Sequence, residues 1–347
     1  MRQLINLMAA IFAIGTVFEQ SGIAEDKPGA LASTGIQQRA EDFVYKKTLG
    51  TRQVWADVNY FSGWRIQENV YTSQCRLVNP QRVVKVTGTL EDCQQNLKSI
   101  REEQKLAPEQ GKAVILIHGL LQTSNCMNQM SISLKDSGFV PVEFDYPSTQ
   151  ISIPEAAGFL NKMVTSLEGF TEIHFVAHSM GGLVVRSFST GTHDQRVKRL
   201  VMLGTPNQGA ELADITQQVW LVRTASGPGA RQLGTRPNGL IKKLPVPNYE
   251  FAVIAGARGT YAGWNPLIPG DDDGTVTVAS TRLPGAADFG TVCKTHGDLL
   301  GDEQAISQTV NFLKSGRLRL EGERTPIPDA KKTDTAQLET SNRFARN

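Results

Sequence analysis

The sequence contains few cysteines and no long hydrophobic run. Only four of its 347 residues are cysteine, and no two of them form a Cys-x-x-Cys pair. Their spacing therefore excludes a zinc site of the usual kind. The apolar stretch from Leu4 to Phe18 is interrupted by Asn6, and it is shorter than the ~20 residues that a membrane-spanning helix needs. A bundle of membrane helices is excluded.

The chain also has almost no excess of charge of one sign. The formal net charge is +2, and the basic residues are scattered rather than gathered in a stripe with aromatic residues. No nucleic-acid partner is expected. With 40% hydrophobic and 20% charged residues, the chain is not wholly disordered. It has the composition of a globular protein that holds one large α/β domain with additions.

The first 24 residues have the pattern of a signal peptide. Met1-Arg2 gives a short positive start, an apolar stretch follows, and Gly22 and Ala24 are small residues at the spacing of a cleavage site. We expect cleavage after Ala24 and export, to the periplasm or to the medium. An uncleaved membrane anchor is the alternative.

Residues 25–110 are expected to form a linker and then a β-rich addition. Three short β-like runs and one surface helix follow the polar residues 25–39: Trp64 to Glu68, Cys75 to Val78, Arg82 to Thr89, and the helix Leu90 to Leu106. In an exported protein Cys75 and Cys93 could form a disulfide, and two free buried thiols are the alternative. No chemistry can be read from this part.

From Ala113 onward, strand-like runs alternate with helix-like runs. The predicted strands are Ala113 to Ile117, Val140 to Phe144, Ile173 to Ala177, Arg199 to Leu203 and Phe251 to Ala255. The predicted helices are Ser124 to Lys135, Pro154 to Leu167 and Leu183 to Ser189. This rhythm predicts an α/β domain over residues 111–315, with a mainly parallel sheet flanked by helices. Such sheets bind ligands at the carboxyl ends of their strands.

Two segments depart from this alternation. Residues 207–247 contain a helix-like run, Asp214 to Val222, and then a loop rich in Gly and Pro. They predict a small cap over the edge of the sheet, and a plain packing helix is the alternative. Residues 316–347 are polar, so a disordered C-terminal tail is expected.

One stretch, Phe175 to Gly182, places Ser179 at a sharp turn from a strand into a helix. Ala177 and Gly181 are small residues at the two positions where larger side chains would collide with the strand and the helix. The stretch resembles the Ala-His-Ser-Met-Gly elbow of small bacterial lipases and esterases, which belong to the α/β-hydrolase superfamily. In that fold the serine is a nucleophile activated by a histidine that a carboxylate orients.

The order of the chain selects the other two groups of a catalytic triad. In this fold the acid follows the nucleophile and the histidine comes last. Of the five histidines, which are His118, His174, His178, His193 and His296, only His296 follows a carboxylate at a strand end. The acid is expected within Asp271-Asp272-Asp273. Asp273 is chosen over Asp272 because it begins the Asp-Gly-x-Val sequence that carries the acid in bacterial lipases. A solvated turn and a calcium site are alternative interpretations of the three carboxylates.

Two backbone amides are expected to bind the oxyanion. One is that of Met180, which follows the nucleophile. The other is that of Leu120, because His118-Gly119-Leu120 after the first core strand resembles the lipase oxyanion loop. Gly204-Thr205-Pro206 resembles a further lipase loop that shapes the pocket wall.

The resemblance covers roughly Lys112 to Leu313 and implies an exported serine hydrolase of carboxylic esters. It favours lipid acyl esters as substrates, with transient contact with a lipid surface. No cofactor or metal is expected, and the oligomeric state is left open. The alternatives are a phospholipid or glycolipid deacylase, since the motifs are similar to those of inositol deacylases, and a binding protein on a hydrolase scaffold without activity.

Overall fold

The computed structural model describes residues 52–191, 194–217 and 227–329. They all lie in the compact unit Lys46–Asn347. The predicted signal peptide, the linker, His193 and Trp220 to Val222 lie outside the described residues. Within the described ranges, no helix is both long enough and apolar enough to span a membrane.

The N-terminal addition is an antiparallel sheet with a helix beside it. The strands pair in the order of the chain: β1 (Trp55–Phe61), β2 (Trp64–Asn69), β3 (Cys75–Val78) and β4 (Val84–Gly88). Ser62 and Gly63 connect β1 to β2 with φ angles of 47° and 82°, and two such residues give a hairpin turn whose twist matches that of the strands. The helix α3 (Leu90–Glu103) begins with a capping box between Thr89 and Asp92.

A small core holds this addition together. Trp64, Ile66 and Leu77 pack there with Leu97 of α3. Cys75 and Cys93 lie in the same core, and both are buried free thiols. The structure therefore has the free-thiol alternative rather than the disulfide, and burial raises the pKa of the Cys75 thiol to about 11.

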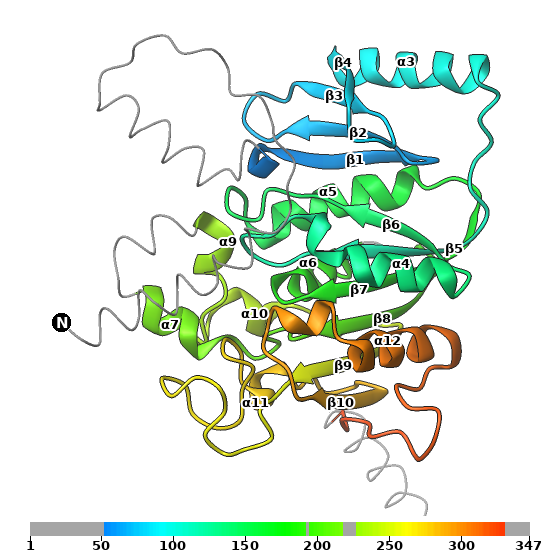
Figure 1. Cartoon of the computed structure of the whole chain (residues 1–347). Coiled ribbons are helices and arrows are strands. Elements are labelled where there is room, and N and C mark those ends of the chain that lie inside the picture. The colour runs from blue at the N-terminus through cyan, green and yellow to red at the C-terminus, as the bar shows by residue number, and fades with distance from the viewer. Residues whose placement is uncertain (1–51, 192–193, 218–226, 330–347) are drawn as a thin grey trace, which may run out of the picture. The chain divides into compact units, whose positions relative to one another are not determined.

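The main domain is built on six parallel strands, as the alternating pattern predicted. They are β5 (Gly111–Ile117), β6 (Val140–Phe144), β7 (Phe170–His178), β8 (Val197–Leu203), β9 (Glu250–Gly256) and β10 (Asp288–Val292), in the order β10-β9-β8-β7-β5-β6. The edge strand β10 was not predicted, because it contains Asp288 and Gly290, and both residue types are rare in strands. Figure 1 shows the two sheets and the helices around them.

Helices cover both faces of the parallel sheet. On one face α5 (Ile153–Ser166) and α6 (Met180–Phe188) pack on the strands. On the other face lie α4 (Asn128–Asp136), which follows the short turn η3 (Ser124–Met127), and α12 (Glu303–Ser315). α5 also contacts β1, and its Phe159 packs against the cores of both sheets. The addition is thus fixed to the main domain through α5.

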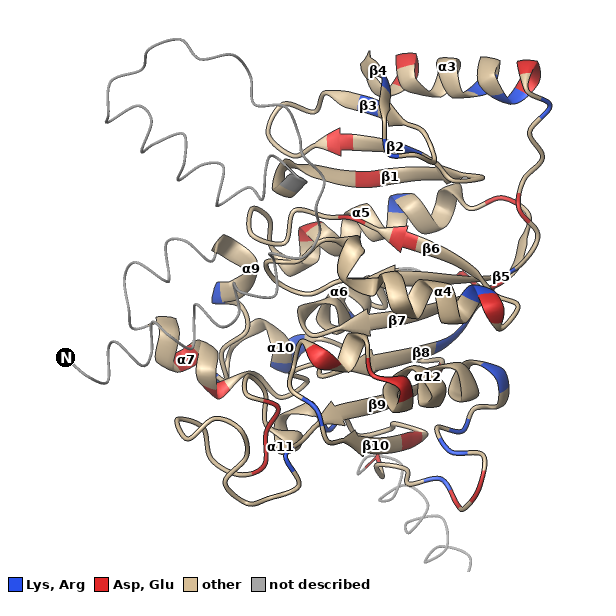
Figure 2. Cartoon of the chain, in the orientation of Figure 1, with Lys and Arg blue, Asp and Glu red and all other residues tan. Residues whose placement is uncertain are grey.

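The buried Asp57 forms a second link between the addition and the main domain, through the backbone of Asp145. The Asp57 amide donates to the Asp145 carbonyl oxygen at 2.9 Å, and the Asp145 amide donates to Asp57 Oδ2 at 2.8 Å. Burial raises the pKa of Asp57 to about 6, and the guanidinium of Arg65 opposes this shift. Elsewhere on the described ribbon, acidic and basic residues are interspersed (Figure 2).

The described part of residues 207–247 packs on the main core and contains three short helices. These are α7 (Glu211–Gln217), α9 (Gly227–Arg231) and α10 (Leu240–Lys243). Ile241 of α10 is buried in that core. Arg186 of α6 holds this segment, because its guanidinium donates to the carbonyl oxygens of Pro245, Asn207, Ile241 and Leu244 and to Asn207 Oδ1. These partners are all neutral, and burial lowers the pKa of Arg186 to about 10.

The expectation of a disordered tail from residue 316 is wrong for residues 316–329. Leu318 is fully buried, and its amide donates to Asp288 Oδ2 of β10 at 2.9 Å. Further along, Ile327 exchanges backbone hydrogen bonds with Gly285 and Ala286. A few residues in a polar stretch were enough to fix it, because the Asp288 carboxylate and the backbone of Gly285 and Ala286, just before β10, bind them. Residues 330–347 lie outside the described residues.

Candidate active site

The turn between β7 and α6 has the geometry of a nucleophile elbow. Ser179 lies between the two elements with φ 54° and ψ −125°, a conformation that residues with a side chain rarely adopt. Gly181 is required by its surroundings, because a Cβ atom there would lie 2.7 Å from the carbonyl oxygens of Ile117 and His118. The sharp turn thus holds the serine at the carboxyl end of β7, and α6 packs tightly behind it.

Substituting Gly181 should destabilise the fold. We expect Gly181→Ala to lose ~1–3 kcal/mol of unfolding free energy, because the new methyl group overlaps the end of β5 and the start of the following loop. Urea denaturation measures the change.

The matched control is Gly158→Ala. Gly158 lies within α5, and a Cβ atom there would have no heavy atom within 4 Å. This variant should be more stable by ~0.5–1 kcal/mol, because alanine favours the helix. If the unfolding free energy changed by the same amount in both variants, the elbow would not be sterically constrained at Gly181.

Ser179, His296 and Asp273 lie in one chain of hydrogen bonds. His296 Nε2 is 2.9 Å from Ser179 Oγ, and His296 Nδ1 is 2.7 Å from Asp273 Oδ2. An ionised carboxylate can only accept, so Nδ1 carries the proton and Nε2 is free to accept from the serine hydroxyl. The structure therefore brings together the three side chains that the sequence selected, in the order that general-base activation of a serine requires.

The turn after Asp273 explains why that carboxylate faces the histidine. Gly274 has φ 95°, and this turn directs the amides of Thr275 and Val276 back to Asp273 Oδ1 at 3.0 and 2.8 Å. The second oxygen is left for His296. Asp273 also accepts the His296 amide through its carbonyl oxygen at 2.8 Å. The Asp side chain is fully buried and the His side chain is 16% exposed.

The two neighbouring aspartates have other partners. Asp272 Oδ1 accepts the amides of Trp264, Asn265 and Gly274, and burial raises the pKa of this carboxyl. Asp271 accepts the amides of Arg258 and Gly259. The three carboxylates thus serve three different turns.

The loop after β5 approaches Ser179 with its backbone. A Cβ atom on Gly119 would lie 3.0 Å from Ser179 Cβ, so only glycine allows so close an approach. Among the described residues, neither the Leu120 amide nor the Met180 amide donates to another group. Both donors that the sequence selected are therefore unused, beside the serine, as an oxyanion hole requires.

Two other histidines lie at this site, and neither side chain has a hydrogen bond to Ser179 among the described residues. His118 is buried and stacks on Tyr146 with ring centroids 4.4 Å apart. His178 Nε2 lies 2.9 Å from the His296 carbonyl oxygen, and its Nδ1 lies 3.0 Å from Gln122 Oε1. Burial, together with the nearby His296 ring, holds the pKa of His178 well below its ordinary value. A neutral His178 adds no positive charge beside His296.

Sequence reasoning missed the glutamine in this arrangement. Gln122 Oε1 also accepts the Gly119 amide at 2.9 Å, so one side chain joins the loop after β5 to the histidine before the elbow. Its position three residues after Gly119 was the available signal, because a side chain at that spacing can reach back to the turn.

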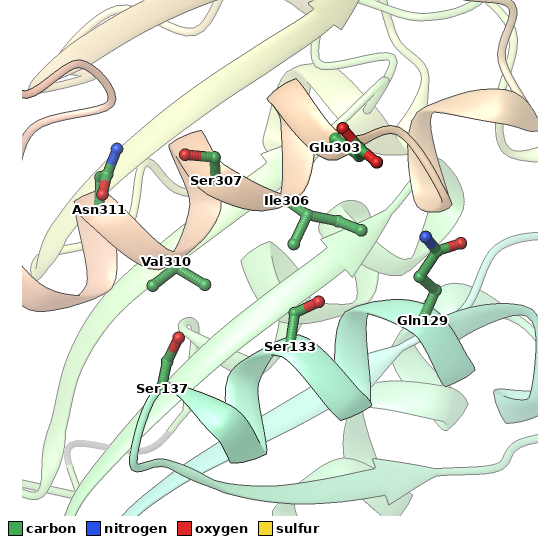
Figure 3. A pocket seen from close by; sticks show the side chains of 8 residues that line it. All are labelled: Gln129, Ser133, Ser137, Glu303, Ile306, Ser307, Val310 and Asn311. Carbon is green, nitrogen blue, oxygen red and sulfur yellow. The ribbon is translucent and has the colours of Figure 1, made fainter.

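A surface groove of about 430 Å³ lies away from these residues, between α4 and α12 (Figure 3). Its lining is mostly polar and comprises Gln129, Ser133, Ser137, Glu303, Ile306, Ser307, Val310 and Asn311. None of the predicted site residues lines it. The groove is therefore separate from the triad residues Ser179, Asp273 and His296.

The parallel sheet, the elbow on β7 and the position of the acid and histidine after later strands define the α/β-hydrolase fold. Residues 80–246 match the model of a family described as a domain of unknown function, DUF7379. The N-terminal part of the addition and the residues Asp273 and His296 lie outside that match.

The chain resembles bacterial triacylglycerol lipases. It is 27% identical over 123 residues to one from Pseudarthrobacter phenanthrenivorans and to one from Burkholderia plantarii. Each match covers 30% of this chain, and 36% and 32% of the respective relative, so the chain spans about a third of these relatives' length. The mature lipase BlEst2 of Bacillus licheniformis is similar in structure, with a TM-score of 0.45 and 20% identity over 58% of this chain and 91% of that one.

Proposed function

We propose that the protein is a serine hydrolase of carboxylic esters that acts through an acyl-enzyme. The observation that carries this proposal is the chain of hydrogen bonds from Asp273 through His296 to Ser179, beside two unused amides. His296 Nε2 takes the hydroxyl proton while Ser179 Oγ attacks the acyl carbon. The amides of Leu120 and Met180 hold the oxyanion. His296 then gives the proton to the leaving alcohol, and a water activated in the same way releases the acid.

We further propose lipid acyl esters as the substrates. The support is the resemblance to proteins named triacylglycerol lipases. The same machinery would serve on a phospholipid or a glycolipid, so those esters are the second candidates. A binding protein without activity is the third candidate, and the intact hydrogen-bonded chain argues against it.

The experiment compares rates on p-nitrophenyl esters of increasing acyl length, on a triglyceride emulsion and on phospholipid vesicles. A lipid hydrolase should prefer longer acyl chains and should release fatty acid from one of the two lipid substrates. A sharp preference for soluble short-chain esters would contradict the lipid substrate but not the ester chemistry. An absence of hydrolysis of every ester would contradict both.

Export through residues 1–24 is part of the same proposal. Its test is the N-terminal sequence of the protein recovered after expression of the full chain in a bacterium. Processing after Ala24 would agree with export, and a retained Met1 in a cytosolic product would contradict it.

A further inference from the structure

Gln53 is a buried side chain of the N-terminal addition that points into the main domain. It lies in the short turn η2 (Arg52–Val54) directly before β1, and only 1% of it is exposed. A buried amide needs partners at both of its ends. Gln53 precedes the segment that matches the family model.

Both ends of the Gln53 amide bind loops beside the predicted site. Its Nε2 donates to the carbonyl oxygen of Gln122 at 2.8 Å. Its Oε1 accepts from Ser148 Oγ and from the amide of Thr149, each at 3.0 Å. Ser148 Oγ in turn accepts the amide of Leu121 at 3.1 Å. Gln53 therefore binds Gln122 directly and Leu121 through Ser148, and these are the two residues that follow Leu120.

These ties hold a backbone conformation that would otherwise be unfavourable. Leu121 has φ 59°, in the left-handed region that costs a residue with a side chain about 1 kcal/mol or more. Such a conformation persists only where its surroundings fix it. If Leu121 returned to a right-handed conformation, the two peptide groups that flank it would rotate. The first of them joins Leu121 to Leu120, so the backbone of Leu120, which also carries the predicted oxyanion amide, would have to adjust.

A second residue of the addition fixes the other loop. Asp57 of β1 is fully buried and exchanges two hydrogen bonds with the backbone of Asp145, at the start of the loop that carries Ser148. The carboxylate of Asp145 accepts the amide of Ser124 at 2.7 Å, beyond the far end of the oxyanion loop. The addition therefore contacts the loop after β6 at two points, and that loop in turn binds Leu121 through Ser148 and Ser124 through Asp145.

We propose that the N-terminal addition orients the oxyanion hole, with Gln53 as the positioning residue that directs the amide of Leu120. This inference rests on the proposed ester hydrolysis. Gln53 does not touch the substrate; it acts through Gln122, Ser148 and Leu121.

The test is Gln53→Met, which keeps the length of the side chain and removes its hydrogen bonds. We expect kcat on a soluble short-chain ester to fall by about tenfold to 100-fold, because a misdirected oxyanion donor loses much of its effect. KM should stay within about twofold, since the ground state gains little from the oxyanion hole. Gln308→Met is the control, because Gln308 is a buried glutamine of α12 that has no hydrogen bond to this loop among the described residues. Its kcat should equal that of the wild type.

A measurement without substrate separates this inference from the proposed function. Hydrogen–deuterium exchange of the peptide that contains residues 118–122 should be faster in Gln53→Met than in the wild type and in Gln308→Met. Unchanged exchange would overturn the inference even if no ester were hydrolysed. Faster exchange with an unchanged kcat on an active enzyme would overturn it as well, because Gln53 would then order the loop without serving catalysis. An inactive wild type would contradict the proposed function alone.

Discussion

Ser179→Ala should lower kcat on an activated short-chain ester by about 10⁶-fold, which is the scale seen when a triad serine is removed. Without Oγ no acyl-enzyme forms, and His296 has no hydroxyl to activate. Steady-state release of p-nitrophenol measures the loss, and circular dichroism with thermal melting checks the fold. Persistent activity in the purified variant would contradict the role of Ser179.

A companion variant, Ser179→Gly, tests the strain at the elbow. Ser179 has φ 54° and ψ −125°, a conformation that alanine tolerates as poorly as serine and glycine tolerates well. We expect both variants to be inactive, and the glycine variant to be more stable than the alanine variant by ~1 kcal/mol. If the two had equal melting temperatures, the turn would store no strain.

Asp273→Asn should lower kcat by about 10⁴-fold with little change in KM, as it does where an asparagine leaves the histidine in the wrong tautomer. The Thr275 and Val276 amides hold Oδ1 of this residue. The amide nitrogen of the new side chain would therefore face His296 Nδ1 as a donor. The histidine would turn its own proton toward Ser179 and could no longer accept from the hydroxyl.

The adjacent Asp272→Asn is the matched control. Asp272 faces Trp264, Asn265 and Gly274 rather than His296, and asparagine keeps one oxygen for these three amides. We expect its kcat to fall by less than about tenfold, because it loses no contact with the triad. An equal loss in both variants, measured under the same conditions, would contradict the choice of Asp273 as the acid.

Local sequence patterns predicted much of the fold and the site. The strand Ala113 to Ile117 was found from its apolar residues alone, because a strand buried on both faces must be apolar throughout. Ser179 and Asp273 were found because each lies in a turn that only a few residue types can form. The residues around His296 form no such recognisable turn. It was selected only because it is the histidine that follows the acid in the chain.

What the sequence did not reveal depends on contacts between distant segments. β10 has Gly290 at its centre, where a Cβ atom would lie 3.1 Å from Gln308 Oε1 of α12, so tertiary packing rather than strand preference decides its residues. Gln53 and Gln122 are polar residues without any periodic pattern. Their importance becomes apparent only in the fold, where Gln53 Nε2 donates to the carbonyl oxygen of Gln122, 69 positions away, at 2.8 Å.

The segment after α12 has a consequence for the solubility of the fold. The strand β10 lies at the edge of the sheet, and Asp288 at its start binds the amides of Leu318 and Thr325. Residues 316–329 thus bind polar groups of an edge strand, and an uncovered edge strand can pair with another molecule. A chain shortened to Ser315 would also uncover the apolar site that Leu318 fills. These fourteen residues therefore protect the edge of the sheet from self-association. Their removal should cause aggregation before it affects the chemistry at Ser179.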